Sequence, residues 1–108
     1  MSTHVRVVLC TVPSEEVGLQ IAHAVVEEHL AACVNIVPHL RSIYRYEGKL
    51  EDDRELLLVI KTSAARFEAL NERLIALHPY ETCEVLALNV TAGSHAYLDW
   101  VLRETSPA

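Results

Sequence analysis

The stretch His78-Pro79-Tyr80-Glu81-Thr82-Cys83-Glu84-Val85 decides how the second half of the chain folds. The residues before it carry apolar side chains at the three- and four-residue spacing of a helix: Phe67, Leu70, Leu74 and Leu77. Pro79 ends that helix, because a proline disfavours helical backbone geometry at the residue before it. Residues 85–90 then form an apolar run that predicts a strand. The stretch is therefore a turn between a helix and a strand, and it carries an imidazole, a thiol and two carboxylates.

Two elements are predicted at the start of the chain. Residues 5–11 are a β-branched, apolar run typical of a buried strand, and Pro13 closes it. Ser14 is a residue type that caps helices, and Glu15 and Glu16 would lie at the positive end of a helix dipole. Apolar side chains four residues apart then predict a helix that reaches about residue 30: Val17, Ile21 and Val25.

A hairpin and a terminal helix complete the pattern. Residues 32–36 predict a strand with a bend at Pro38, which resumes over residues 42–46, turns, and returns over residues 56–62. A short helix is expected after residues 93–94. The order is that of the ferredoxin-like βαββαβ plan, an α+β fold with an antiparallel sheet and here an extra C-terminal helix. Right-handed crossovers give the strand order 4-1-3-2, and we predict one domain over residues 1–108.

The composition excludes several classes of partner. The chain has 108 residues, of which 51% are hydrophobic and 22% are charged, as is typical of a globular domain. Its net charge of -6 opposes attraction to nucleic-acid phosphate or to an anionic membrane surface. Residues 1–6 lack the long apolar region of a signal peptide, and no apolar run has membrane-spanning length. We therefore expect a cytoplasmic protein with no nucleic-acid and no membrane partner.

The topology predicts where the reactive side chains meet. The first strand ends where the fourth begins, so Cys10 is expected near Cys83 and Glu84, and the second helix brings His78 to the same end. The first helix also starts there, and its dipole would favour a thiolate at Cys10. Thiolate and imidazole ligands suit copper or zinc better than magnesium or calcium. Cys10, His78 and Glu84 are therefore candidate metal ligands, although Glu84 has Lys61 as an alternative partner.

Each of these residues also has a purely structural interpretation. Cys10 ends an apolar strand and is a residue type that is often buried, and His78 can cap the last carbonyl groups of its helix. Cys83 alternates with Glu84 along the strand, so only one of the two faces a given side. Cys33 lies in an apolar run and is expected in the core. The three cysteines are odd in number and far apart, which indicates free thiols in a reducing compartment.

Catalysis is an alternative to metal binding. A helix N-terminus beside Cys10 could activate the thiol as a nucleophile, with His78 as its base. The sequence offers no obvious third residue to orient that base, and it contains no G-x-S-x-G, Walker or dinucleotide-binding motif. We therefore expect that the protein is not an enzyme.

Several different short motifs follow one another along residues 5–103. They are Leu9-Cys10-Thr11 with Pro13, residues 30–36, Ser42-Ile43-Tyr44, Glu47-Gly48-Lys49, Ile60-Lys61-Thr62, His78-Pro79-Tyr80-Glu81 and Tyr97-Leu98-Asp99-Trp100. In this order and spacing the chain resembles the CutA family of divalent-cation tolerance proteins. The resemblance implies a cytosolic homotrimer built like the nitrogen-regulatory PII signal proteins and tied to copper and other divalent metals.

The resemblance also implies a site. Some family members bind copper through a thiol and an imidazole, which by position correspond to Cys10 and His78. The chain departs from the family's usual pattern at Cys83, where a proline is common, and at Tyr46, where a tryptophan is common. We expect a homotrimer that joins its sheets through the hairpin of residues 40–57 and binds copper, or zinc or another divalent metal ion. The alternatives are a PII-like trimer that binds a small anionic ligand between subunits, and a trimeric scaffold for other proteins.

Overall fold

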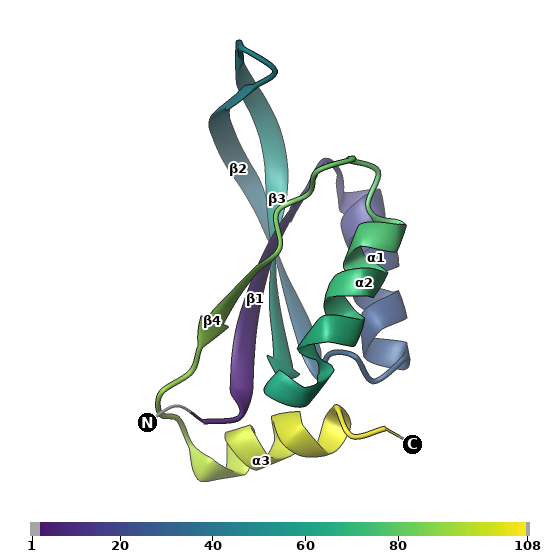
Figure 1. The fold of residues 1–108 in the computed structure, drawn as a ribbon, viewed down its shortest axis with the longest axis vertical. Coiled ribbons are helices and arrows are strands. Elements are labelled where there is room, and N and C mark those ends of the chain that lie inside the picture. Colours follow the sequence, from purple (N-terminus) through teal and green to yellow (C-terminus); the bar gives the residue numbers. More distant parts are fainter. Residues whose placement is uncertain (1–2, 108) are drawn as a thin grey trace.

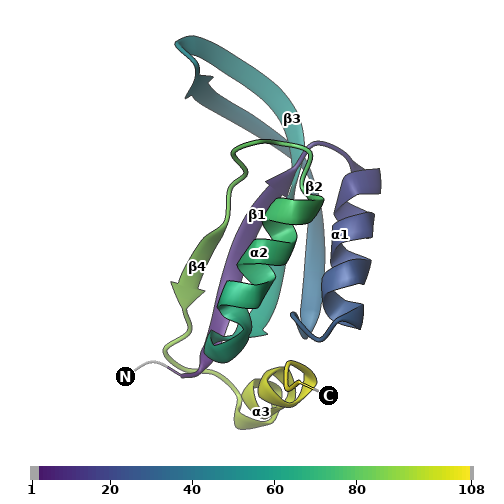
Figure 2. The ribbon, with the colours of Figure 1, turned by 45° about the vertical axis from the view of Figure 1, so that its right-hand side comes forward.

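A four-stranded antiparallel sheet forms the centre of the structure, a computed structural model that describes residues 3–107 (Figure 1). Its strands are β1 (Val5–Val12), β2 (Cys33–Tyr46), β3 (Lys49–Ser63) and β4 (Leu86–Asn89). Helices α1 (Glu15–Glu27) and α2 (Phe67–Leu77) cover one face of the sheet, and α3 (His95–Glu104) lies across its end (Figure 2). A short 3-10 turn, Ala64–Arg66, precedes α2. Residues 1, 2 and 108 of the predicted domain lie outside the described residues.

The sheet has the predicted topology. The strand order is β2-β3-β1-β4, and every neighbouring pair is antiparallel. The α+β fold class and the order 4-1-3-2 are therefore confirmed. Leu9 pairs with Leu86, so β4 begins beside the end of β1, as the topology requires. None of the helices in residues 3–107 is long and apolar enough to cross a membrane.

The core lies between the sheet and the two helices that cover it. Its fully buried side chains alternate along β1 and follow the apolar stripes of α1 and α2: Val8, Cys10, Val12, Ile21, Val25, Leu70 and Leu74. Each buried aliphatic side chain of this kind contributes roughly 1.5–3 kcal/mol relative to an exposed one. Gly18 lets α1 approach the sheet closely, since a Cβ atom there would lie 3.3 Å from a methyl group of Val12.

The returning strand of the β2–β3 hairpin, β3, is longer than predicted. The returning strand begins at Lys49 instead of Leu56, because cross-strand contacts hold its charged first half. Arg41 forms a bidentate ion pair with Asp52 at 2.8 Å, and the Tyr44 hydroxyl donates to Asp53 at 2.5 Å. The hairpin therefore projects beyond the helices as a two-stranded ribbon (Figure 1).

Irregular backbone shapes this hairpin and the end of α1. The predicted bend near Pro38 is a register shift between Val37 and Leu40, and His39 there has a φ of 67°. Glu47 and Gly48 both have positive φ, as in tight hairpin turns with two central residues. Helix α1 ends at Glu27, earlier than predicted, because the chain turns at a left-handed His29.

Candidate metal site at the end of strand β1

Three segments that are distant in the sequence meet at the end of β1, and we call this region the β1 corner. It comprises Cys10, Thr11, His78, Cys83 and Glu84, which come from β1, the end of α2 and the turn before β4. The start of α1 lies close by, since Ser14 follows β1 directly and its hydroxyl accepts the Val17 N–H at 3.2 Å. This contact confirms the predicted helix cap.

His78 is held by hydrogen bonds from both ring nitrogens. It caps α2, with its backbone N–H donating to the Leu74 carbonyl group. Its Nε2 lies 2.7 Å from the Thr11 carbonyl oxygen, and its Nδ1 lies 3.1 Å from the Tyr80 backbone nitrogen. A carbonyl oxygen can only accept, so Nε2 carries the proton and Nδ1 accepts. The imidazole is therefore neutral and fully hydrogen-bonded, and the residue is only 7% exposed.

The Cys10 thiol lies beside the same carbonyl oxygen but faces the core. Its sulfur is 3.8 Å from the Thr11 oxygen, and the residue is fully buried. Burial, and then the nearby Cys83, Glu84 and Glu55, raise the pKa of this thiol from 9.0 to about 12. The prediction that the helix dipole favours a thiolate here is wrong. A helix dipole contributes only about 0.3–1 kcal/mol, which does not offset the loss of hydration of a buried thiolate.

The neighbours of Cys10 are partly those that the topology predicts. Cys83 and Glu84 lie close enough for their charges to act on the thiol, which confirms the predicted proximity. Burial raises the pKa of the half-buried Cys83 thiol as well. Lys61 does not pair with Glu84, because its ammonium group donates to the Asn35 side chain and to Cys33 Sγ.

Cys33 lies outside the core, so its expected position is wrong. Side chains alternate along β2, and Val34 and Ile36 pack against the helix-side core while Cys33 points to the opposite face. The thiol there contacts Lys61 Nζ at 3.5 Å and the Tyr97 hydroxyl at 3.9 Å. The three free thiols of the described chain thus differ in their surroundings: one is fully buried and two are half-buried.

The candidate ligands are near one another without forming a ready coordination shell. Within residues 3–107, no group of three or more His, Cys, Asp or Glu side chains has an arrangement that could hold a metal ion. The donor chemistry of the β1 corner nonetheless fits a soft or borderline metal, because a thiol and an imidazole converge on one carbonyl oxygen. A metal ion there would have to displace the thiol proton and the Nε2–H···O bond of His78.

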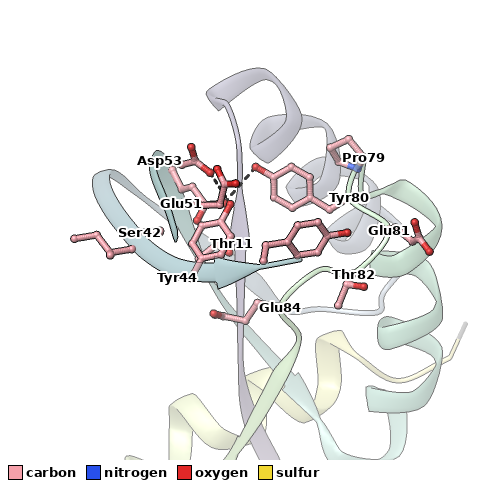
Figure 3. Close-up of a pocket in the computed structure, with 13 residues that line it drawn as sticks. Thr11, Ser42, Tyr44, Glu51, Asp53, Pro79, Tyr80, Glu81, Thr82 and Glu84 are labelled. Atoms are coloured by element: carbon pink, nitrogen blue, oxygen red, sulfur yellow. Dashed lines mark hydrogen bonds between the residues drawn. The ribbon is translucent and has the colours of Figure 1, made fainter. Parts of the chain in front are cut away.

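A large cavity adjoins the β1 corner, between the projecting part of the β2–β3 hairpin (residues 42–46 and 51–55) and the turn of residues 79–84 (Figure 3). We call it the acidic pocket; its volume is about 810 Å³. Its lining contains five carboxylates and three tyrosines but no lysine or arginine of the described chain: Glu51, Asp53, Glu55, Glu81, Glu84, Tyr44, Tyr46 and Tyr80. Glu84 belongs both to this lining and to the β1 corner. Sequence patterns did not predict the pocket, because it depends on how far the hairpin extends past the turn.

Fold and site together define a class of protein: a small ferredoxin-like α+β subunit with an extended hairpin and a thiol–imidazole corner beside an acidic cavity. The family model described as "CutA1 divalent ion tolerance protein" matches residues 6–104. The chain belongs to this family, which confirms the resemblance seen in its motifs.

Individual relatives agree with this assignment. The chain is 57% identical over 100 residues to "Divalent-cation tolerance protein CutA" of Thermus thermophilus, covering 93% of this chain and 97% of that protein. A solved structure of a divalent cation tolerance protein from Thermus thermophilus superposes with a TM-score of 0.92 at 55% identity, covering 94% of this chain and 99% of that one. "Protein CutA, chloroplastic" of Arabidopsis thaliana is 48% identical over 92% of this chain, which spans only 54% of that relative.

Proposed function

We propose that the chain acts in tolerance of divalent metal ions and binds copper, or a similar ion such as zinc, at the β1 corner. Cys10 and His78 are the principal ligands in this proposal, and Glu84 is a weaker third. The observation that supports it most is that the Cys10 thiol and the His78 imidazole lie beside a single oxygen atom, the Thr11 carbonyl. Thiolate and imidazole together suit copper and zinc better than magnesium or calcium.

Binding in this proposal is coupled to proton release and to a local rearrangement. The thiol has a pKa of about 12, so it is protonated at neutral pH and must lose its proton to the solvent when a metal ion binds. The imidazole would have to turn its Nε2 from the Thr11 carbonyl to the metal and move its proton to Nδ1, which would then no longer accept the Tyr80 N–H. Only metal ions with high affinity for sulfur can offset these two costs. This requirement favours copper over the hard divalent ions.

Titration with copper and zinc tests the proposal. Cys10→Ser should lose most of the affinity, because a hydroxyl group is a poor ligand for these ions. Cys33→Ser is the matched control, since it removes a thiol that lies on the opposite face of the sheet. Equal affinities for wild type, Cys10→Ser and His78→Ala would rule out the β1 corner as the binding site.

The chain is proposed to work as a cytoplasmic homotrimer that joins its sheets through the hairpin, and without a catalytic role. Both edge strands, β2 and β4, lack a strand partner on their outer side within the described chain. Large apolar side chains are exposed on the hairpin and on β4: Ile43 (65%), Leu50 (71%) and Leu86 (55%). Exposed edges and apolar patches of this kind favour pairing between chains. A monomer mass in light scattering at micromolar concentration would contradict the assembly.

Binding of a small anionic ligand receives less support. The acidic pocket carries five carboxylates and no basic side chain of the described residues, so it repels anions. A thermal-shift screen with nucleotides and small carboxylates would identify such a ligand elsewhere on the assembly. The scaffold alternative would gain support only if neither metal ions nor small molecules bound.

A further inference from the structure

Cys83 is a second thiol at the β1 corner that the proposed metal site does not use. Its neighbours Thr82 and Glu84 both line the acidic pocket, whereas the Cys83 side chain does not (Figure 3). Thr11 lines the same pocket from β1, and its neighbour Cys10 faces the helix-side core instead. Because side chains alternate along extended backbone, Cys83 and Cys10 both point away from the pocket, towards the helices.

The register of the sheet brings the two thiols together on that side. Leu9 pairs with Leu86, so Cys10 lies opposite Val85 when the antiparallel register is continued by one residue. Cys10 is fully buried between the sheet and the helices, and Val85 packs against the same core. Cys83 precedes Val85 by two residues and is therefore the diagonal neighbour of Cys10 on the same face.

The separation of these two residues is close to that of a disulfide. Among the charged groups around the Cys10 thiol, Cys83 has the largest effect on its pKa, ahead of Glu84 and Glu55. Diagonal neighbours in a sheet have Cα atoms about 7–8 Å apart, whereas a disulfide takes about 4.4–6.8 Å, so a shift of roughly 1–2 Å closes the bond. Residues 81–85 are free to make this shift, since they precede β4 and form no backbone–backbone hydrogen bond within the described chain.

We propose that Cys10 and Cys83 form a reversible disulfide under oxidation, and that this bond closes the β1 corner to metal ions. Cys83 is the thiol that meets the oxidant, because it is half-buried whereas Cys10 is fully buried. The bond removes Cys10 from the candidate ligands, so only the reduced protein binds metal. The crosslink follows from the placement of the thiols alone, and its effect on metal binding rests on the proposed function. Transient disulfides of this redox-sensing kind also occur in reducing compartments.

The oxidation balances with a peroxide as the oxidant. The Cys83 sulfur attacks one oxygen of hydrogen peroxide, the O–O bond breaks, and the displaced hydroxide leaves as water with the thiol proton. The Cys10 sulfur then attacks the sulfenic acid at Cys83: the S–S bond forms, the S–O bond breaks, and the hydroxyl group leaves as a second water with the Cys10 proton. Two electrons pass from the two thiols to the peroxide. A dithiol reductant restores both thiols by exchange.

Peptide mapping after oxidation tests the crosslink without any metal. The reduced, assembled wild type is treated with hydrogen peroxide and a chelator, its remaining thiols are alkylated, and the chain is digested with trypsin and a glutamate-specific protease. The second protease is required because trypsin leaves Cys10 and Cys33 on one peptide, residues 7–41. We expect a linked pair of peptides that carry Cys10 and Cys83, lighter by two hydrogen atoms than their sum. Dithiothreitol should separate the pair.

Two serine variants serve as matched controls for the mapping. Cys33→Ser removes the thiol on the opposite face of the sheet and should keep the crosslink. Cys83→Ser should leave Cys10 reduced under the same treatment, because the buried thiol then has neither a partner nor access to the oxidant.

Zinc titration of the same samples tests the effect on metal binding. Zinc replaces copper here because Cu(II) can itself oxidise thiols. The oxidised wild type should lose most of its zinc affinity and regain it after treatment with dithiothreitol. Cys83→Ser, treated in the same way, should keep its zinc affinity, because its Cys10 stays reduced.

Three results would overturn the inference. The first is a linked peptide that joins Cys33 to another thiol, or two copies of Cys83, in place of the pair Cys10 and Cys83. The second is a wild type in which peroxide converts Cys83 to a sulfinic acid while Cys10 stays reduced. The third is a zinc affinity that oxidation lowers equally in wild type and Cys83→Ser. If the reduced wild type bound neither zinc nor copper, the proposed function would fail together with the metal gating, and the peptide map alone would decide the crosslink.

Discussion

Copper affinity at the β1 corner should depend on pH through the Cys10 thiol. Burial and the surrounding acidic groups raise the pKa of this thiol to about 12, so below that pH the metal ion must displace a whole proton from the sulfur. The affinity contributed by Cys10 should therefore rise about tenfold for each pH unit and level off only near pH 12. Compared with a thiol of pKa 9.0, a thiol of pKa 12 lowers the apparent affinity at neutral pH about a thousandfold.

Competition titrations against a chelator of known proton affinity, at about pH 6.5, 7.5 and 8.5, would measure this dependence. The comparison with Cys10→Ser isolates the thiol, because both proteins keep the same imidazole and carboxylates. The plot of log affinity against pH should be steeper by about one for wild type than for Cys10→Ser. Equal slopes for the two proteins would mean that the sulfur releases no proton, and the argument for thiolate ligation would then be refuted.

Two further predictions concern stability. Leu74→Ala should lower the free energy of unfolding by about 2–5 kcal/mol in urea titrations, because it leaves a cavity in the fully buried core. The control Ala76→Gly, at an exposed position of the same helix, should lower it by only about 1 kcal/mol. A similar loss for both variants would contradict the packing of this core. Tyr44→Ala should lower the melting temperature and weaken assembly together, because association and folding are linked by mass action. If the melting temperature and the mass from light scattering both stayed unchanged, the hairpin would not join the subunits.

The fold could be predicted because its local patterns agree with one another. The apolar spacing of Phe67, Leu70, Leu74 and Leu77, the stop at Pro79 and the cap at Ser14 all recur in the structure. The first half of β3 was missed because residues 49–55 are mostly charged and have little strand propensity of their own. They form a strand because partners on β2, distant in the sequence, pair with them.

The candidate site could be predicted only as a set of neighbours. Topology was sufficient to bring Cys10 close to His78, Cys83 and Glu84. The protonation of the thiol and the two hydrogen bonds of the imidazole depend on burial and on backbone atoms of other segments, which no local pattern encodes. The burial of Glu55 was missed for the same reason, since it follows the charged run of residues 51–54.

A crystal structure of the copper-loaded protein, with anomalous diffraction at the copper edge, would locate the bound metal directly. One anomalous peak is expected in each subunit, within bonding distance of Cys10 Sγ and a ring nitrogen of His78. The contact between His78 Nε2 and the Thr11 carbonyl oxygen is expected to be broken. Copper bound only to carboxylates in the acidic pocket, with the His78 contacts intact, would contradict the proposed site.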